Sequence, residues 1–478
     1  MSCFDRANTR RALVVAVLGV LVTTAAVPLA AVGVADAAGP DCPSVSSTSD
    51  NGVTTTGATD PLTITHTFEN LPDRPGEVQV TVEADAPDSV SAVTLRPPED
   101  ASVVNADGYQ RTDDGWIWER SAAPETATLT YVVTVNRTED GTLEATSTGE
   151  WALFNWRNAD TRWSYSRAAD APEPAVVERG EATGEGVVGP GYAYLGPYET
   201  ETRAVDGETI RLVVPETADM AASPVTVADA LARASNSLRV GARNNRLTVF
   251  VAPRPIEAAG RLSRAETNGR QDAYVGADRR LDTPDNSWFH EYVHSRQSYE
   301  ASPGMAWFGD ATTEYYGAWL AYDGGHVSEA AFYDYVRTDK EGDAVLRESA
   351  DGDLATYFKG MRVLAALDAE LRAVTGGDQT LQSVFRCVNS NEGTITYATF
   401  VALVEEVAGE NRDEWLATYV GTDALPPVPY YISEQTPTAT PAIDGDRQNI
   451  GSSPMIGGLL FIAALVVGVG TFFLWWRG

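Results

Sequence analysis

Two histidines and a glutamate with helical spacing are the residues of this sequence best suited to chemistry. His290, Glu291 and His294 form an HExxH pattern. Because residues i and i+4 share one face of an α-helix, the two imidazoles can bind one zinc ion. Glu291 can then reach a metal-bound water as a general base. The chain has only four histidines, so the presence of two of them in this pattern argues against coincidence.

A catalytic zinc site needs a third protein ligand and an open position for water. The segment Trp307–Tyr316 follows the motif and carries two acids in aromatic surroundings, Asp310 and Glu314. Their spacing of four places both carboxylates on one helix face. One of them can bind the metal, and the other can orient a ligand histidine. The residues alone leave open which acid has which role.

Three motifs in this order resemble the gluzincin zinc metallopeptidases, a group that includes the aminopeptidase N and glycyl aminopeptidase families. They are HExxH, the Trp-x-x-acid-small segment that begins at Trp307, and Tyr-x-Lys-Gly at Tyr357–Gly360. The resemblance covers about residues 225–425. It implies a thermolysin-like, mostly helical catalytic domain that hydrolyses peptide bonds with a Zn²⁺ cofactor.

The resemblance also implies a role for each matching residue. His290 and His294 take the places of zinc ligands, and Glu291 takes the place of the general base and later proton donor. Asp310 stands where the family has a glutamate as third ligand. Tyr357 occupies the place of the tyrosine that stabilises the oxyanion of the tetrahedral intermediate.

The aspartate is a departure from the family pattern. Aspartate is one methylene shorter than glutamate, so the helix that carries Asp310 must lie about 1 Å closer to the zinc. The Trp-x-x-acid frame favours Asp310 as the third ligand. Glu314 is the alternative ligand, or else it orients a ligand histidine. A weakened or lost metal site is the third possibility.

Two questions about activity stay open at this point. The related aminopeptidases carry a Gly-x-Met-Glu-Asn-like segment that holds the substrate amine, and none occurs between Leu247 and Trp288, so the mode of cleavage is undecided. The favoured hypothesis is that the chain is a membrane-anchored, extracellular zinc peptidase acting on peptides or proteins. The alternative is a catalytically weak or inactive surface binding protein on a peptidase-like scaffold. A structural cell-wall protein would require the HExxH pattern to be accidental.

The elements around the motif predict a multidomain α+β chain. Residues 42–205 contain short alternating runs between Pro, Gly and Asp clusters, which indicates a β-rich domain, either a sandwich or a curved sheet. Residues 206–425 form the predicted peptidase domain. There we expect a helix over Val227–Val240 with Thr226 as N-cap, strands at Leu247–Val251 and Asp272–Val275, and mostly helices after Pro284.

Both ends of the chain point to a membrane. Residues 1–37 combine arginines, an apolar run and a small-x-small pattern, which predicts an export signal of the secretory or twin-arginine type. Residues 455–476 carry no charge and would span about 33 Å as a helix, enough for one transmembrane helix. A flexible linker is predicted at 434–454. We therefore expect a single-pass protein of the cell membrane with its catalytic domain outside.

Charge and cysteine content add two constraints. With 35 Lys+Arg against 67 Asp+Glu, the net charge of −32 argues against nucleic acid as a partner. Only Lys340 and Lys359 are lysines, and such an acid-rich, lysine-poor surface is typical of salt-adapted (halophilic) proteins. Outside the predicted signal, Cys42 and Cys387 are the only cysteines, and in an exported protein they could form one disulfide.

Overall fold

The computed structural model describes Cys42 and residues 60–122, 127–265 and 267–430. The predicted export signal (1–37), linker (434–454) and membrane helix (455–476) lie outside the described residues. Within the described part, no helix combines the length and the apolar character needed to cross a membrane.

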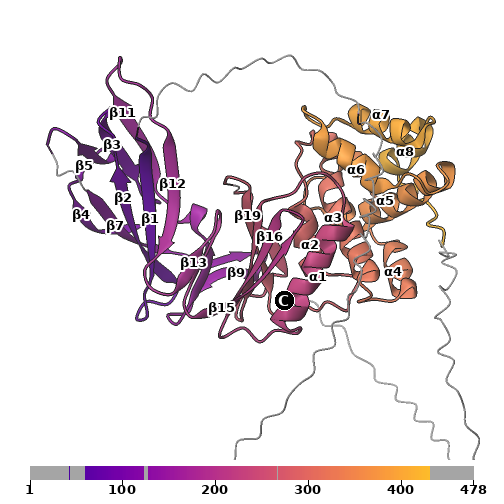
Figure 1. The fold of residues 1–478 in the computed structure, drawn as a ribbon, viewed down its shortest axis with the longest axis horizontal. Coiled ribbons are helices and arrows are strands. Elements are labelled where there is room, and N and C mark those ends of the chain that lie inside the picture. The colour runs from indigo at the N-terminus through magenta and orange to yellow at the C-terminus, as the bar shows by residue number, and fades with distance from the viewer. Residues whose placement is uncertain (1–41, 43–59, 123–126, 266, 431–478) are drawn as a thin grey trace, which may run out of the picture. The chain divides into compact units, whose positions relative to one another are not determined.

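The N-terminal part is β-rich, as predicted, and holds three sheets (Figure 1). Its strands alternate between buried and more exposed side chains, as the run Leu62–Asn70 illustrates. The apolar faces meet in one core that includes Ile64, Val93 and Phe154. In sheet order the strands are β12 (Val176–Ala182), β1 (Leu62–Asn70), β2 (Glu77–Asp85), β7 (Thr128–Thr134) and β4 (Ser102–Asp107); β11 (Arg162–Arg167), β3 (Val90–Arg96), β6 (Gly115–Glu119) and β5 (Gln110–Thr112); and β13 (Gly186–Val188), β14 (Tyr192–Leu195), β10 (Ala152–Asn155), β9 (Thr142–Ser147) and β8 (Arg137–Glu139).

A fourth sheet begins the region predicted as the peptidase domain. Its order is β15 (Tyr198–Val205), β16 (Glu208–Pro215), β17 (Arg246–Ala252), β19 (Arg270–Gly276) and β18 (Gly260–Leu262). The predicted division after residue 205 therefore falls inside the β15–β16 hairpin. Asp206 and Gly207, with φ values of 44° and 83°, form its turn. An Asp-Gly pair between alternating runs is a hairpin signal, and it places β15 with the second domain.

The two faces of this fourth sheet have different partners. One face packs on α1 (Pro224–Ser237) and the helices beyond it, through residues such as Leu212 and Val249. The other face carries Phe250 and Tyr274, which pack against Tyr192 of β14 in a cluster that also includes Tyr194 of β14 and Leu153 of β10. The sheet is therefore buried against helices on one side and against the β-rich part on the other.

Helix α1 confirms the predicted helix but starts earlier than expected. Its N-cap is Ser223, whose side chain accepts a hydrogen bond from the Thr226 backbone N–H at 3.2 Å, so Thr226 is not the cap. Pro224 at the first helical position removes an N–H that would have no partner in the helix. The helix ends at Ser237, before the expected end at Val240.

The rest of the described chain is mostly helical, as predicted. Helix α3 lies beside both α2 and α5, and α6, α7 and α8 complete the cluster (Figure 1). The helices are α2 (Ser287–His294), α3 (Trp307–Asp323), α4 (Glu329–Val336), α5 (Leu354–Val374), α6 (Leu381–Ser390), α7 (Tyr397–Ala408) and α8 (Asp413–Gly421), with short 3-10 turns at Trp156–Asn158, Pro303–Met305 and Leu346–Glu348.

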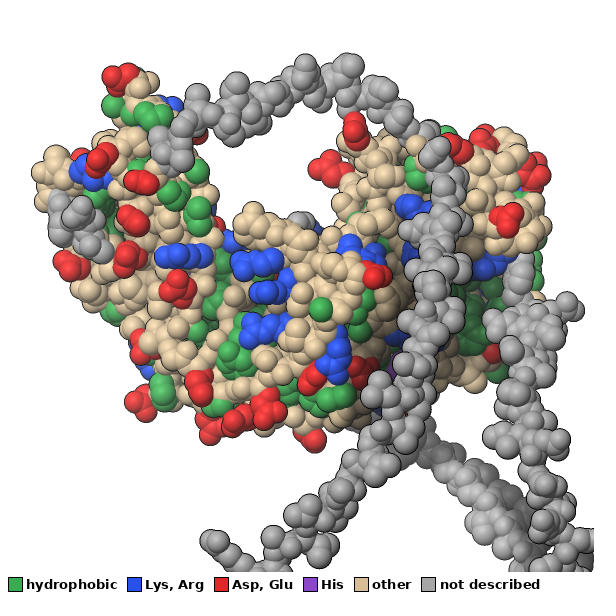
Figure 2. Space-filling view, viewed as in Figure 1, with side chains coloured by type: hydrophobic (Ala, Val, Ile, Leu, Met, Phe, Trp, Pro, Cys, Tyr) green, Lys and Arg blue, Asp and Glu red, His purple; other side chains and the backbone are tan. Residues whose placement is uncertain are grey.

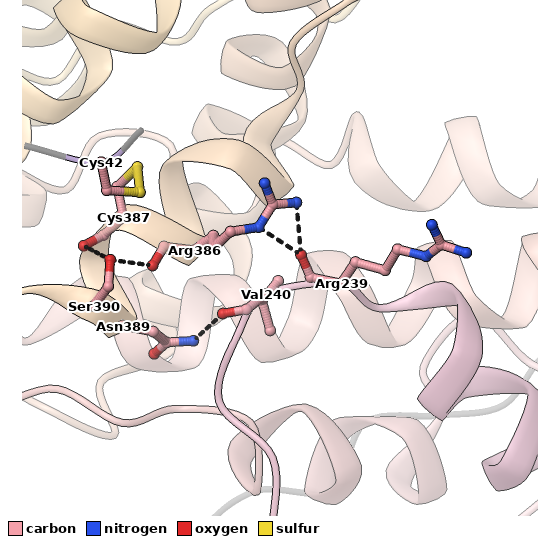
Figure 3. The surroundings of a disulfide bond; sticks show 7 residues. All are labelled: Cys42, Arg239, Val240, Arg386, Cys387, Asn389 and Ser390. Carbon is pink, nitrogen blue, oxygen red and sulfur yellow. Dashed lines mark hydrogen bonds between the residues drawn. A yellow bond between two sulfur atoms is a disulfide. The ribbon is translucent and has the colours of Figure 1, made fainter. Parts of the chain in front are cut away.

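A disulfide joins Cys42 to Cys387 of α6, which confirms that these two cysteines pair (Figure 3). Around it, Arg386 donates to the carbonyl of Arg239, and the Asn389 side chain donates to the carbonyl of Val240 at 2.8 Å. The bond and these contacts tie α6 to the N-terminal end of the described chain and to the segment that follows α1.

Candidate metal centre

Helix α2 presents the HExxH residues to a cleft. Its N-cap is Asn286, whose side-chain oxygen accepts from the Phe289 backbone N–H at 3.2 Å. Within this short helix the rings of His290 and His294 lie 4.9 Å apart between centroids. Residues such as Trp288, on other faces of the helix, are buried in the core. The local sequence therefore fixes both the start of the helix and the side that its histidines share.

Glu314 of α3 holds the first imidazole. The Nδ1 atom of His290 lies 3.1 Å from Oε2 of Glu314, and the Tyr335 hydroxyl donates to the other carboxylate oxygen. Because a carboxylate only accepts, this contact places the imidazole proton on Nδ1. The Nε2 atom of His290 is then free to serve as a ligand.

Gln297 holds the second imidazole in the same way. The Nδ1 atom of His294 lies 3.1 Å from Oε1 of Gln297. The Gln297 amide nitrogen donates to the carbonyl of Gly309 at 2.8 Å, which fixes the amide orientation and leaves Oε1 as the acceptor. The Nδ1 atom of His294 therefore carries the proton, and its Nε2 atom keeps a lone pair.

Asp310 is oriented through one carboxylate oxygen. Its Oδ2 atom accepts from the Thr356 hydroxyl at 2.9 Å and from the Gly352 backbone N–H at 3.0 Å. Its Oδ1 atom lies 3.9 Å from Nε2 of His294. Two ligands of one tetrahedral zinc ion are about 3.4 Å apart, so a small adjustment would bring both atoms to coordination distance.

Glu291 carries a buried oxygen whose hydrogen-bonding capacity is not satisfied. Its side chain is buried, and its Oε2 atom has no hydrogen-bond partner among the described residues. Gly260 gives it room, because a Cβ at residue 260 would lie 2.9 Å from Cγ of Glu291. A buried carboxylate oxygen without a partner is costly unless a water, a proton or a metal satisfies it. The donor set and this orphaned oxygen fit a zinc-water centre.

Tyr357 stands on α5 above the first histidine. Its ring is stacked on His290, with 5.8 Å between centroids and 9° between planes. The neighbouring motif residues are structural: Lys359 is buried and donates to the Thr422 carbonyl at 2.7 Å. A Cβ at Gly360 would lie 2.7 Å from that of Ala311, so the glycine lets α5 approach α3 closely.

The electrostatics separate the two histidines. Burial would lower the pKa of His290, but its hydrogen bond to Glu314 and the nearby acids outweigh burial and raise this pKa to about 9, so zinc must displace the proton on Nε2 when it binds. Burial and the charge of His290 lower the pKa of His294 to about 3. Burial also raises the pKa of Glu291 to about 7 and raises that of Tyr357. Enclosure of the site is the largest cause of the shifts of His294, Glu291 and Tyr357, whereas the acids around His290 determine the direction of its shift.

All the predicted site residues line one cleft of about 1190 Å³, together with residues of the β-rich part such as Asn136 and Asn158. They are His290, Glu291, His294, Asp310, Glu314 and Tyr357. Among the described residues, no three ligating side chains already stand at metal-binding geometry.

Sequence reasoning missed four residues that orient the site. Gln297 could have been found as a polar residue three positions after His294, close enough to reach its ring. Tyr335, Gly352 and Thr356 carry no such signal, because they lie far from their partners in sequence and reach them only through the packing of α3, α4 and α5.

Similarity to known proteins is found at the level of structure and not at the level of sequence. No family model matches the chain, and no curated protein matches it significantly. The fold is similar to solved M1 zinc metallopeptidases. The enzyme from Deinococcus radiodurans is 14% identical over 78% of this chain and 96% of that chain, with a TM-score of 0.47. An aminopeptidase N family protein from Idiomarina loihiensis is 14% identical over 77% of this chain and 76% of that chain, with a TM-score of 0.49.

A third similar structure is the Legionella pneumophila aminopeptidase A, 11% identical over 78% of this chain and 50% of that chain, with a TM-score of 0.41. The similar structures therefore belong to the group that the sequence motifs resemble. TM-scores below 0.5 say nothing about activity, so the function proposed next rests on the side-chain geometry described above.

Proposed function

We propose that this chain is a zinc metallopeptidase, with His290, His294 and Asp310 as metal ligands. One observation carries the proposal: both imidazoles are held through Nδ1 by neighbouring side chains, while Nε2 of His294 faces a free oxygen of Asp310. Ligand histidines are characteristically oriented by such second contacts. Glu314 is already engaged by His290 and Tyr335, which favours Asp310 as the third ligand.

The residues divide the work of hydrolysis among them. When bound, zinc supplies a Lewis acid that polarises the peptide carbonyl and lowers the pKa of a coordinated water. Glu291 accepts a proton from the attacking water and passes it to the amine nitrogen as the C–N bond breaks. The hydroxyl of Tyr357 donates to the carbonyl oxygen as that oxygen gains negative charge.

We also infer a place for the enzyme outside the cell, anchored by its C-terminus. The signal-like pattern at 1–37 and the uncharged run at 455–476 support this placement. The Cys42–Cys387 disulfide supports it independently, because disulfides persist mainly in oxidising compartments. Cell fractionation with protease protection tests it. A full-length chain found in the soluble intracellular fraction would contradict it.

The decisive experiment compares the full-length chain with a Glu291→Gln variant on a library of fluorogenic peptides. Loss of the general base should lower kcat by about 10²–10⁴-fold while zinc content is retained. The matched control is Glu300→Gln, which changes an exposed glutamate in the chain that follows α2. This variant should keep full activity. Equal cleavage by the parent and the Glu291→Gln variant would contradict the proposal.

A binding protein without turnover is the second candidate. It is favoured by the shorter acid at residue 310 and by the absence, among the described residues, of three ligands already at coordination geometry. A chain that holds zinc, binds peptides and cleaves none of the library would support this second function.

A further inference from the structure

Three arginines stand together on one face of the sheet formed by β15–β19. Arg246 of β17 is in register with Arg270 of β19 on one side and with Thr209 of β16 on the other. Arg211 follows Thr209 by two residues on β16, so its side chain points to the same face. We call Arg211, Arg246 and Arg270 the arginine row.

The arginine row has no acidic partner within the described part of the chain. Arg246 and Arg270 are exposed and Arg211 is half-buried. None of the three forms an ion pair or a side-chain hydrogen bond with the described residues, whereas Arg203 on the neighbouring strand β15 pairs with both Glu201 and Asp229.

This arrangement is unusual for such an acidic chain. Like charges directly opposite each other on adjacent strands are destabilising. The sequence has 67 acids against 35 basic residues, yet the acid nearest in register on this face, Asp272, accepts from the backbone N–H groups of Gly191 and Tyr192 and not from the row. Figure 2 shows Lys and Arg side chains gathered over the strands of this sheet. Local positive charge kept at a cost to folding is the signature of a binding surface.

The arginine row continues from the candidate catalytic cleft. Arg264, in the loop of the β18–β19 hairpin that leads into Arg270, lines the cleft. The row lies on the sheet face that also carries Tyr274, another cleft residue. A chain leaving the cleft along this hairpin would therefore reach the row.

We propose that the arginine row binds an acidic segment of the polypeptide substrate, to one side of the bond that is cleaved. The proposal rests on the proposed peptidase function. Guanidinium groups bind carboxylates with paired hydrogen bonds. Strands lie about 4.8 Å apart, so the row spans about 10 Å from β16 to β19. Acidic residues at alternate positions of an extended peptide recur every 6.8 Å or so and fit that span.

The chemistry favours a short acidic peptide over larger polyanions. A net charge of −32 repels nucleic acids and anionic membranes as a whole. Three cations can neutralise only a few carboxylates. The row would bind an acidic substrate segment more tightly than a neutral one. The rest of the acidic surface offers an acidic segment little attraction.

The test measures binding without relying on turnover. Full-length protein carrying Glu291→Gln is titrated into two labelled peptides with the same core, one followed by alternating aspartates and the other by alternating asparagines. We expect the acidic peptide to bind at least tenfold more tightly at the lowest salt at which the circular dichroism spectrum is unchanged. The preference should shrink as salt rises.

Two triple variants decide whether the arginine row is responsible. Replacing Arg211, Arg246 and Arg270 by Gln should reduce the preference to less than twofold. The matched control replaces Arg96, Arg111 and Arg162 of the β11-β3-β6-β5 sheet by Gln, which removes the same charge and should keep the preference. Circular dichroism and melting curves verify folding, and Arg270→Gln alone serves if the triple variant unfolds.

Each remaining outcome has a defined meaning. Equal binding of the two peptides by the parent, or an acidic preference that survives loss of the row, would overturn the proposal. Binding of anionic vesicles or DNA that depends on the row, without a peptide preference, would also overturn it. If the parent cleaves no peptide but the row still selects the acidic one, the peptidase function fails while the row stands as a binding site.

Discussion

At the scale of single residues, the site depends on side chains that hold the ligands as much as on the ligands. His290, His294 and Asp310 each form a hydrogen bond to a neighbouring side chain through one of their two polar atoms. The other polar atom, Nε2 of each histidine and Oδ1 of the aspartate, is left for a metal. Preorganisation of this kind lowers the cost of ordering the ligands when the ion binds.

Thr356→Val should weaken zinc binding by about ten- to a hundredfold, because Asp310 loses the hydroxyl that orients its carboxylate. Thr356→Ser keeps the hydroxyl and should bind zinc nearly as tightly as the parent. Competition with a chromophoric chelator measures both affinities. Equal affinities for the valine and serine variants would show that this hydrogen bond does not position Asp310.

The sequence predicted the residues of the motif better than their supports. Helical spacing was enough to predict that His290 and His294 share one helix face beside Glu291. It was also enough to predict that Asp310 and Glu314 share one face of α3. The division of roles between the two acids depends on Tyr335 and Thr356, which come from other helices. Such contacts are set by tertiary packing, which a single sequence does not reveal.

At the scale of elements, the close approach of α3 and α5 positions the site. Gly360→Ala should destabilise the fold by about 1–3 kcal/mol, because the new Cβ would lie 2.7 Å from that of Ala311. It should also lower zinc affinity, since α5 carries both Thr356 and Tyr357. Chemical denaturation and chelator competition measure the two effects.

Gly421→Ala near the end of α8 is the matched control for that prediction, because the nearest atom to its new Cβ is 3.9 Å away on Arg347. We expect this variant to be neutral or slightly stabilising, since alanine favours helix over glycine. If both variants behaved alike, close packing at residue 360 would not be what limits the α3–α5 distance.

The elements themselves were largely predictable. The alternating runs of the β-rich part and the helices after Pro284 follow from hydrophobic periodicity. The boundaries of elements were predicted less well. Thr226 lies inside the first turn because Ser223 caps the helix, and β15 pairs with β16 across the Asp206–Gly207 turn. Both depend on local hydrogen bonds that hydrophobic periodicity does not report.

At the scale of the whole molecule, Asp272 links the fourth sheet to the β-rich part. Its carboxylate accepts from the backbone N–H groups of Gly191 and Tyr192 at 3.0 and 2.9 Å. A Cβ at Gly189 or Gly191 would collide with Asp272 or Ser263, so the loop needs glycine there. The carboxyl group is fully buried at this junction.

Burial raises the pKa of Asp272 from 3.8 to about 7. Between these values the folded state holds a proton that the unfolded state has lost, so the contribution of this group to stability falls as pH rises from about 4 to about 7. Asp272→Asn removes this dependence. The stability of the parent relative to the variant should therefore fall by up to about 4 kcal/mol over that window. Denaturation curves at pH 4 and 8 that give the same difference would contradict this account.

The disulfide joins two residues that are 345 positions apart in the sequence. Cys42→Ser should lower stability by about 2–5 kcal/mol, because the unfolded chain regains the freedom that the bond removes. Denaturation with and without reductant measures the effect. The parent should respond to reductant and the variant should not, and an unresponsive parent would show that the bond contributes nothing to stability.

The measurement that tests the central claim most directly is the zinc content of the purified full-length chain. Elemental analysis is run in high salt beside a His290→Ala/His294→Ala variant of the same chain. The proposed centre predicts about one zinc per chain in the parent and none above background in the variant. A parent without zinc after reconstitution, or a variant that keeps the same content, would contradict it.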